Sequence, residues 1–292
     1  MKIAIFGQYY QSDTEEIVEK VLQILLENKV DVIIEKNFKQ NIKTELKQKC
    51  HIYSSHEELE NDIDVLISIG GDGTILRAVT YVRDKNIPIV GINAGRLGFL
   101  ATVQIKSIEP FLHRILAKEY SISKRSLLSL SCTPKNPDLV DLNFALNEIT
   151  VSRKDTTSMI TIETYLNGEY LTSYWADGLI ISTPTGSTGY SLSCGGPVLT
   201  PNVNSLVITP IAPHNLNARP LVIPDDTEIT LKVSGREEQY LVSLDSRITS
   251  VTNETLLKIE KTSFEINMVA FNEEGFLKTI RKKLLWGEDR RN

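Results

Sequence analysis

The amino-acid sequence predicts two domains of different class, an α/β domain with a parallel sheet followed by a larger, β-sandwich-like all-β domain. Strand-like and helix-like segments alternate in the first third of the chain, which is typical of a parallel sheet covered by helices. Beyond about residue 105, short β-branched segments follow one another between turns, as in a β-sandwich. A chain of 292 residues is long enough for both cores.

The first domain is expected to span residues 1–105. Lys2–Phe6 is an apolar run that predicts a buried strand. A capping box formed by Ser12 and Glu15 predicts the start of a helix directly after it. The alternation continues with strands at Val30–Glu35, Asp64–Ile69 and Ile87–Ile92 and with a helix over Thr74–Arg83.

The second domain is expected to span residues 106–271, and it opens with a helix over Ile108–Lys118. Its clearest signal is a hairpin in which Asn167-Gly168 supplies the two left-handed positions of a type I′ turn. Further strands are predicted at Asn147–Ser152, Leu179–Ser182, Leu206–Thr209, Glu228–Val233, Tyr240–Leu244, Leu256–Glu260 and Phe264–Val269. The tail, Phe276–Trp286, has helical spacing again.

Composition excludes several classes of partner. The net charge of −5 provides no basic field for a nucleic-acid backbone or an anionic membrane. The three cysteines, Cys50, Cys132 and Cys194, form neither a disulfide framework nor a metal-ligand spacing. The opening MKIAIFG is too short for a signal peptide, and no apolar run approaches the length of a membrane span. We expect a soluble, cytoplasmic protein with no nucleic-acid or membrane partner.

The segment ISIGGDGTILR (67–77) places a glycine-rich turn between a strand and a helix. Gly70, Gly71 and Gly73 let the backbone approach a phosphate closely, and Thr74 opens a helix whose N-terminus favours an anion. The segment is not a Walker A loop, because no Lys follows the final Gly, and it lacks the spacing of a dinucleotide fingerprint. A tight turn in which Asp72 only caps the helix is the alternative.

Two further segments place polar or flexible residues at the end of a strand. PIVGINAGRLGFLA (88–101) is rich in glycine where binding crevices of α/β sheets lie, or it is a flexible connection between domains. DGLIISTPTGSTGYSLSCGGP (177–197) offers hydroxyls and amides that suit a nucleoside, with Tyr190 able to stack, or it is a polar loop. Asn147-Glu148 offers an amide and a carboxylate to ribose hydroxyls, or it is a polar strand entry.

Together these segments resemble the NAD kinase family. Four motifs of that family occur here in the family's order: GGDGT (Gly70–Thr74), NAGRLGF (Asn93–Phe99), Asn147-Glu148 and Asp177–Ser193. Lipid kinases of the diacylglycerol type and phosphofructokinases carry motifs similar to GGDGT, so TPTGST is the discriminating segment. The resemblance implies a Rossmann-like nucleotide-binding first domain, a β-rich NAD-binding second domain, and a C-terminal segment, 272–292, that packs back on the first.

The resemblance also implies an activity. Members transfer the γ-phosphate of ATP, or in some cases a phosphate of polyphosphate, to the adenosine 2′-hydroxyl of NAD, with Mg²⁺ bridging the phosphates. No residue is assigned as a direct metal ligand. Members are often homodimers or homotetramers.

Site residues are carried over position by position. Asp72 matches the proton acceptor, and Asn147 and Glu148 match the pair that holds the ribose. The other NAD-binding positions are Gly73, Arg77, Phe99, Asp177, Thr188, Gly189, Tyr190, Ser191, Leu192, Ser193, Ala212 and Asp245. The phosphate-binding positions are Gly70, Gly71, Gly73 and Thr74.

Three departures from the family pattern leave contacts open. Gly189 stands where Ala is frequent, Trp175-Ala176 where many members have an Arg or a small residue, and Ser246 where many have Gly. Two other functions compete with NAD phosphorylation: a lipid kinase that shares GGDGT, and a catalytically silent NAD(P) sensor.

Overall fold

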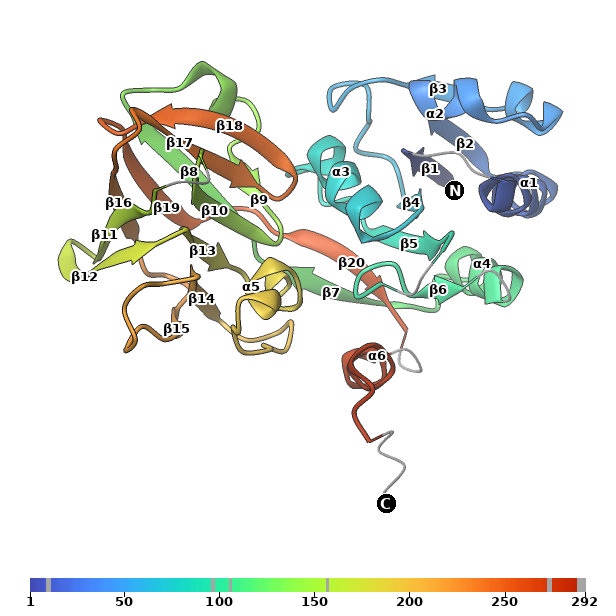
Figure 1. Ribbon diagram of the computed structural model, residues 1–292. Coiled ribbons are helices and arrows are strands. Elements are labelled where there is room, and N and C mark those ends of the chain that lie inside the picture. The colour runs from blue at the N-terminus through green and yellow to red at the C-terminus, as the bar shows by residue number, and fades with distance from the viewer. Residues whose placement is uncertain (9–11, 96–97, 105–106, 156–157, 272–274, 288–292) are drawn as a thin grey trace. The chain divides into compact units, whose positions relative to one another are not determined.

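The computed structural model describes residues 1–8, 12–95, 98–104, 107–155, 158–271 and 275–287 (Figure 1). The chain forms two compact units. The first comprises Met1–Lys124 and Ile266–Asn292, and the second comprises Arg125–Glu265. The first has α/β architecture and ends in a helix, and the second is β-rich, so the expected fold class is confirmed.

The first unit is built on one eight-stranded sheet in the order β3-β2-β1-β4-β5-β20-β7, with β6 beside β5. Its strands are β1 (Lys2–Gly7), β2 (Asp31–Glu35), β3 (His51–Tyr53), β4 (Val65–Ile69), β5 (Ile89–Asn93), β6 (Val103–Gln104), β7 (Ser121–Arg125) and β20 (Ile266–Ala270). Every residue of β4 and β5 is buried, which explains their continuous apolar character. Because β4 and β5 pair in parallel, GGDGT and NAGRLGF leave the sheet at the same edge.

The first unit also contains helices, and the longer ones among them bury one apolar face. The helices are α1 (Ser12–Glu27), α2 (Lys36–Asn41), the 3₁₀-helix η1 (Glu45–Lys49), α3 (Asp72–Val82), α4 (Ile108–Leu116) and α6 (Phe276–Leu284). On α1 the predicted face of Ile17, Val21, Leu22 and Leu25 is completely buried. The predicted capping box includes Ser12, whose side chain lies outside the described part of the structure.

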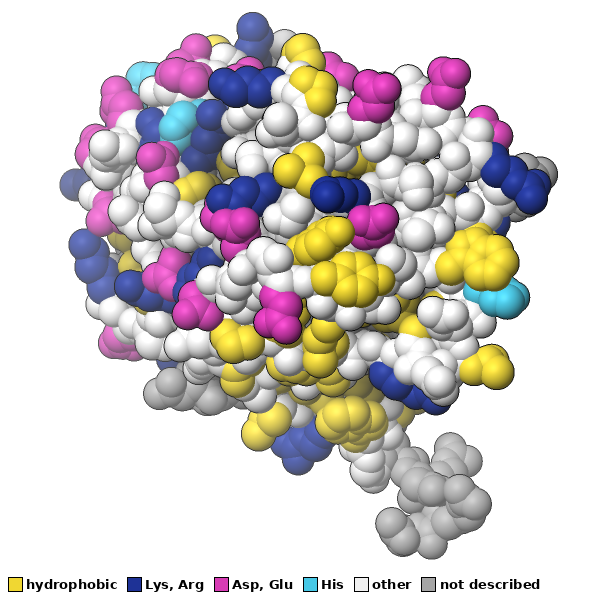
Figure 2. Space-filling view, turned by 90° about the vertical axis from the view of Figure 1, so that its left-hand side faces the viewer, with side chains coloured by type: hydrophobic (Ala, Val, Ile, Leu, Met, Phe, Trp, Pro, Cys, Tyr) yellow, Lys and Arg dark blue, Asp and Glu magenta, His cyan; other side chains and the backbone are white. Residues whose placement is uncertain are grey.

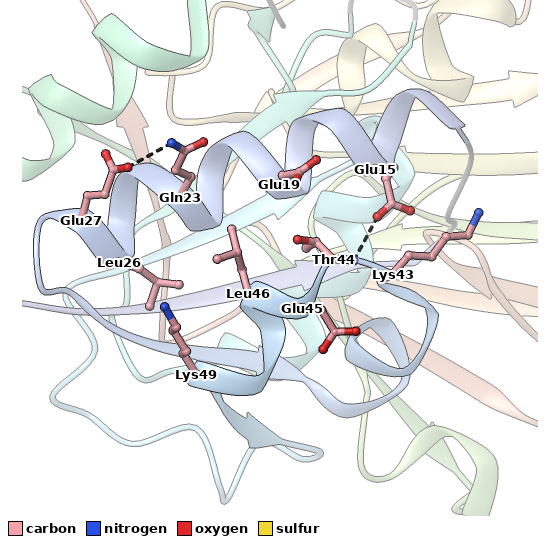
Figure 3. Close-up of a pocket in the computed structure, with 10 residues that line it drawn as sticks. All are labelled: Glu15, Glu19, Gln23, Leu26, Glu27, Lys43, Thr44, Glu45, Leu46 and Lys49. Atoms are coloured by element: carbon pink, nitrogen blue, oxygen red, sulfur yellow. Dashed lines mark hydrogen bonds between the residues drawn. The ribbon is translucent and has the colours of Figure 1, made fainter.

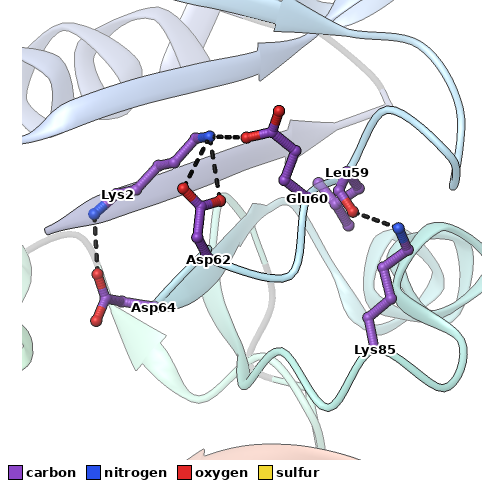
Figure 4. A network of polar contacts seen from close by, with 6 residues as sticks. All are labelled: Lys2, Leu59, Glu60, Asp62, Asp64 and Lys85. Carbon is purple, nitrogen blue, oxygen red and sulfur yellow. Dashed lines mark hydrogen bonds and ion pairs between the residues drawn. The ribbon is translucent and has the colours of Figure 1, made fainter.

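Polar contacts fix the start of β1 against the segment that precedes β4 (Figure 4). The backbone N–H of Lys2 donates to Asp64 Oδ2 at 2.9 Å. The Lys2 ammonium contacts Glu60, and it lies 3.1 Å from Asp62 Oδ1. Exposed ion pairs of this kind contribute about 0–1 kcal/mol each, so the buried strands, and not this network, supply most of the stability.

The second unit packs two six-stranded antiparallel sheets. One has the order β12-β11-β16-β19-β8-β9, with β8 (Leu128–Thr133), β9 (Phe144–Ala145), β11 (Ile160–Leu166), β12 (Glu169–Ala176), β16 (Ile229–Ser234) and β19 (Leu256–Lys261). The other has the order β15-β14-β13-β10-β17-β18, with β10 (Glu148–Arg153), β13 (Gly178–Ser182), β14 (Ser205–Ile211), β15 (Leu221–Pro224), β17 (Gln239–Leu244) and β18 (Arg247–Thr252). Short helical turns occur at η3 (Pro137–Leu139), η4 (Gly186–Thr188) and α5 (Tyr190–Ser193).

The predicted hairpin is present in this unit. β11 pairs antiparallel with β12, and the turn residues Asn167 and Gly168 have φ values of 50° and 82°. A single core of apolar side chains from both sheets lies between them, with Ile149, Ile181 and Leu231 among its fully buried members.

The units divide the chain at 124/125 and 265/266, whereas the sequence suggested 105/106 and 271/272. The difference arises because α4, β7 and β20 join the first unit. The strand expected over Phe264–Val269 is β20, in which Met268 pairs in parallel with Ile89 of β5. Periodicity identifies a strand but not the sheet that it enters, so the sequence could not place it. No helix within the described ranges is long and apolar enough to cross a membrane.

Candidate functional site

The carboxylate of Asp72 is the most firmly held group of the first unit's site residues. Asp72 is the first residue of α3, and its Oδ2 accepts the backbone N–H of Phe99 at 2.7 Å. Its Oδ1 accepts the N–H groups of Leu100 and Ala101 at 3.0 and 2.9 Å. An ionised carboxylate has about four lone-pair positions, so these three bonds fix its orientation and leave capacity for one more proton donor.

Glycines make this arrangement sterically possible. A Cβ added at Gly98 would lie 1.9 Å from Asp72 Oδ1, so only glycine lets residues 98–101 close over the carboxylate. Gly70 has φ +150°, and a Cβ there would lie 2.3 Å from Thr74 Oγ1. The two motifs that were recognised separately in the sequence therefore form one structure around Asp72.

The other glycines of GGDGT face open space. Gly71 and Gly73 are exposed, and a Cβ at either would meet nothing within 4 Å. Backbone that is open at the start of a helix suits a phosphate. Thr74 is buried, and Arg77 is exposed one turn after Gly73 on α3.

A contact from the C-terminal helix reaches Phe99. The Lys283 ammonium of α6 lies 5.7 Å from the centroid of the Phe99 ring, a cation–π distance. The sequence predicted a helix over this tail but not this contact, because spacing along the chain gives no sign of a contact between residues so far apart.

The second group of site residues lies in the second unit and is described by itself. Strands β13, β10 and β17 are neighbours in one sheet, and the register pairs Glu148 with Ser182 and Ile149 with Leu244. This pairing brings the TPTGST turn, the Asn147-Glu148 pair and Asp245 to the same end of the sheet.

Asp245 holds the backbone of the Asn147-Glu148 segment. It has a left-handed φ of 52°, and its Oδ1 accepts the N–H groups of Asn147 and Glu148 at 2.8 and 3.2 Å. Its Oδ2 accepts the N–H of Leu146 at 2.9 Å. Burial raises the pKa of the Asp245 carboxyl, and these N–H bonds, together with the charge of Arg247, oppose that rise.

Asn147 and Glu148 each carry a buried oxygen without a hydrogen-bond partner, Asn147 Oδ1 and Glu148 Oε2. Burial raises the pKa of Glu148 to about 8, and the charge of Asp245 adds to the rise. Since buried polar atoms are normally hydrogen-bonded, two such oxygens on consecutive residues indicate a ligand position. Gly189 borders this position, because a Cβ there would lie 2.9 Å from Glu148 Oε2.

The TPTGST turn is stabilised from within. Thr183 Oγ1 donates to Leu146 O at 2.6 Å and accepts the Gly186 N–H at 3.1 Å. A Cβ at Gly186 would lie 2.1 Å from Asn147 O, so the turn packs directly on the pair. Buried Ser187 and Ser191 bond to Pro184 O and to Thr209 Oγ1, so these hydroxyls, which the sequence suggested for a ligand, bond within the fold.

The remaining predicted site residues of the second unit differ in how far they are exposed to solvent. The Tyr190 ring is exposed, and burial of its hydroxyl, then Cys194 and Asp177, raises its pKa. Gly189 and Thr188 are half-buried, as is Leu192, whereas Ser193 is exposed. Ala212 is exposed, with φ 44°, and follows β14.

Asp177 has a partner that the sequence did not reveal. Arg153 Nη2 lies 3.0 Å from Asp177 Oδ2, and the Arg153 backbone N–H donates to Asp177 O at 3.0 Å. The Arg153 guanidinium comes from β10, whereas Trp175 and Ala176 directly precede Asp177 in the chain. Finding it required the pairing of β10 with β13, which is a tertiary property.

Two surface hollows are separate from these residues. Figure 3 shows one of about 1070 Å³ between α1 and η1, where Glu15 Oε1 accepts the Thr44 N–H at 3.1 Å. The other, of about 500 Å³, lies between β12 and residues 215–221. None of the expected site residues lines either hollow. Over the described ranges, no three His, Cys, Asp or Glu side chains are grouped to hold a metal ion.

Comparison with known proteins gives a consistent result. Residues 3–120 match the ATP-NAD kinase N-terminal domain, and residues 146–271 match the ATP-NAD kinase C-terminal domain. The chain is 68% identical to the NAD kinase of Flavobacterium psychrophilum and 63% identical to that of Flavobacterium johnsoniae, each over 100% of both chains.

Two solved structures are similar over almost the whole chain. A yeast NADH kinase complexed with NADH has a TM-score of 0.86 and 26% identity, covering 99% of this chain and 89% of its own. An NAD kinase from Archaeoglobus fulgidus in complex with ATP has a TM-score of 0.73 and 26% identity, covering 97% of each chain. By sequence and by structure, the chain belongs to the ATP-NAD kinase family.

Proposed function

We propose that this enzyme transfers the γ-phosphate of MgATP to the 2′-hydroxyl of the adenosine ribose of NAD and so makes NADP. The full-length identity of 68% to an NAD kinase supports the reaction. The observation that carries the residue assignment is the Asp72 carboxylate, which three backbone N–H groups hold in one orientation at the start of α3. No observation favours a lipid kinase or a silent sensor.

Asp72 is the general base. A ribose hydroxyl is a poor nucleophile, so phosphoryl transfer depends on positioning, on charge neutralisation and on removal of the hydroxyl proton. With three of its lone pairs occupied, Asp72 has one remaining position for that proton. Because the carboxylate cannot rotate, it stays oriented toward the hydroxyl whose proton it accepts. General-base assistance increases a reaction rate by about 10²–10⁴-fold.

The other predicted residues bind the substrates. The buried oxygens of Asn147 and Glu148 bond to ribose hydroxyls, and the exposed Tyr190 ring stacks on the base. Phe99, Asp177 and Ala212 contribute to the NAD site. The remaining NAD-binding positions are Gly73, Arg77, Thr188, Gly189, Leu192 and Ser193, and buried Ser191 supports them through its bond to Thr209 Oγ1.

The donor phosphates bind at Gly70, Gly71, Gly73 and Thr74, where the backbone is open. Mg²⁺ would be held mainly by the ATP phosphates and by waters, and bound there it would neutralise phosphate charge.

The test is the reaction itself. Purified protein is incubated with NAD and MgATP, and NADP is measured. In parallel reactions polyphosphate replaces ATP, and NADH replaces NAD because one structural neighbour is an NADH kinase. Diacylglycerol serves as the competing acceptor. No NADP from any combination would exclude the proposal.

The Asp72→Asn variant tests the base. We expect turnover to fall by about 10²–10⁴-fold while NAD binding changes only a few fold. Because the Asn amide cannot accept all three N–H bonds, a thermal melt must accompany the assay. A folded variant with near-normal turnover would show that Asp72 is not the base.

We also propose that the protein works in the cytoplasm as a homodimer or homotetramer. The second unit exposes large apolar side chains on β12, β15 and the loop before β15, with Trp175 47% and Leu216 90% exposed. Figure 2 shows hydrophobic side chains among mixed charges on the side where β12 lies. Sedimentation velocity of the wild type and of Leu216→Asp would test the assembly; a monomeric wild type would exclude it.

A further inference from the structure

The carboxyl groups of Asp245 and Glu148 lie at the same end of one sheet in the second unit, but Asp245 accepts more hydrogen bonds than Glu148. Asp245 accepts the N–H groups of Leu146, Asn147 and Glu148 within 3.2 Å. Glu148 Oε2 is buried and has no partner among the described residues, and its carboxyl receives one backbone N–H bond, from Tyr190.

The allocation of donors decides which group carries the negative charge. N–H bonds stabilise a carboxylate, and burial without donors stabilises the neutral acid. The charged residue that acts on Asp245 is Arg247, whose guanidinium also donates to the carbonyls of Leu142 and Phe144. The groups that act on Glu148 are Asp245 and the Tyr190 backbone, and neither is a cation.

We propose that Glu148 is a neutral carboxylic acid at physiological pH, and that it binds the substrate as a hydrogen-bond donor through Oε2. Asp245 is the positioning residue that keeps Glu148 neutral, because it accepts the backbone N–H groups of Leu146, Asn147 and Glu148 and its charge acts on the Glu148 carboxyl. This inference rests on the proposed function only for the identity of the ligand, a ribose hydroxyl oxygen. The raised pKa of Glu148 is consistent with it.

Gly189 gives this donor its position. A Cβ at residue 189 would lie 2.9 Å from Glu148 Oε2 and 3.1 Å from Gly186 O, so an alanine would press on the carboxyl from the ligand side. The missing Cβ of Gly189 therefore leaves Oε2 free to meet the substrate.

The first experiment titrates Glu148 in the ligand-free protein. Protein labelled with ¹³C at the Glu side-chain carboxyl is followed by NMR between pH 4 and pH 9, and Glu148→Gln assigns the signal. We expect a midpoint near 8. A midpoint near the ordinary value for Glu would overturn the proposal. This measurement needs no activity, so its failure is distinct from failure of the kinase reaction.

The second experiment uses three variants at pH 7. A neutral donor is retained in Glu148→Gln, so we expect its KM for NAD to stay within about threefold of wild type, whereas Glu148→Leu should raise KM by about tenfold or more. Gly189→Ala should also raise KM for NAD, because its Cβ would press on Glu148 Oε2. Glu237→Gln, an exposed position of the same unit, is the matched control.

The pH profile separates donor from acceptor. In the wild type, KM for NAD should rise above pH 8 as Glu148 ionises, and in Glu148→Gln this rise should be absent. If Glu148→Gln loses NAD affinity as severely as Glu148→Leu, Glu148 acts as a charged acceptor and the proposal is wrong.

Discussion

At the scale of single residues, the enzyme depends on contacts that only glycine allows. Gly98 lies against Asp72, and Gly186 and Gly189 lie against Asn147 and Glu148. In each case a missing Cβ lets a backbone segment approach a polar group of the proposed site. The sequence marked these glycines as flexible, but their role is close approach to one specific neighbour.

Gly98→Ala tests this role in the first unit. The new methyl group would overlap Asp72 Oδ1, which lies 1.9 Å from the ideal Cβ position, so the carboxylate must move. A displacement of a catalytic group by about 1 Å can lower kcat by about 10²-fold. Overpacking lowers the free energy of unfolding by about 1–3 kcal/mol.

The matched control is Gly95→Ala in the same segment, where a Cβ meets nothing within 4 Å. Its kcat and unfolding midpoint should resemble those of the wild type. Equal kcat values for the two alanine variants would show that the position of Asp72 does not matter for the reaction.

Glu148 also predicts a dependence of stability on pH. Its folded-state pKa is raised to about 8, so between its ordinary pKa and 8 the folded protein holds a proton that the unfolded chain releases. Stability should therefore fall as pH rises through this window, by an amount on the order of a few kcal/mol. Urea unfolding of Glu148→Gln should give the same midpoint as wild type at pH 4.5 and a higher midpoint at pH 8. Equal midpoints at both pH values would contradict the assignment.

At the scale of elements, two short connections define the group of site residues in the second unit. The TPTGST turn follows β13, and the two-residue turn Asp245-Ser246 joins β17 to β18. β10 lies between β13 and β17 in the sheet, and both turns pack against the residues that lead into β10. The turn with Asp245 thus acts on its neighbour strand and not on the ligand directly.

Asp245→Ala should damage this arrangement. It leaves three backbone N–H groups without their acceptor and places alanine at φ 52°, so we expect a loss of about 2–4 kcal/mol and a raised KM for NAD. Denaturation and steady-state kinetics check both effects. Asp226→Ala, an exposed acid of the same unit, should change neither. A wild-type KM in Asp245→Ala would refute the positioning role.

Much of this could be predicted from the sequence, because the signals are local. The α/β rhythm, the type I′ hairpin and the glycine motifs depend on residues close in the chain. What escaped prediction depends on pairing: β7 has the mostly polar sequence SISKR, and the Arg153–Asp177 ion pair appears only once β10 lies beside β13. The burial of Ser187 and Ser191 likewise depends on which side of the turn faces the sheet.

At the scale of the whole molecule, the second unit is one continuous segment and the first is not. The chain leaves the first sheet at β7 and rejoins it at β20, after residues 125–265. The second unit has its own two sheets and its own core, which is the requirement for independent folding.

Residues 125–265 expressed alone should therefore unfold cooperatively, as measured by circular dichroism in urea. Residues 1–124 alone lack β20, the strand between β5 and β7, and should unfold at lower urea than a version in which a flexible linker joins them to residues 266–292. A segment 125–265 without a cooperative transition would show that the two units fold only together.

The position of β20 has a consequence for synthesis on the ribosome. β7 is made early, yet its place in the first sheet is beside β20, which is translated only after the entire second unit. β6, which is made soon after β5, pairs with Ile92 and Asn93, but the position beside Ile89 that β20 takes stays unfilled until residues 125–265 have been translated. GGDGT and NAGRLGF emerge early, but the sheet on which they lie can close only near the end of translation.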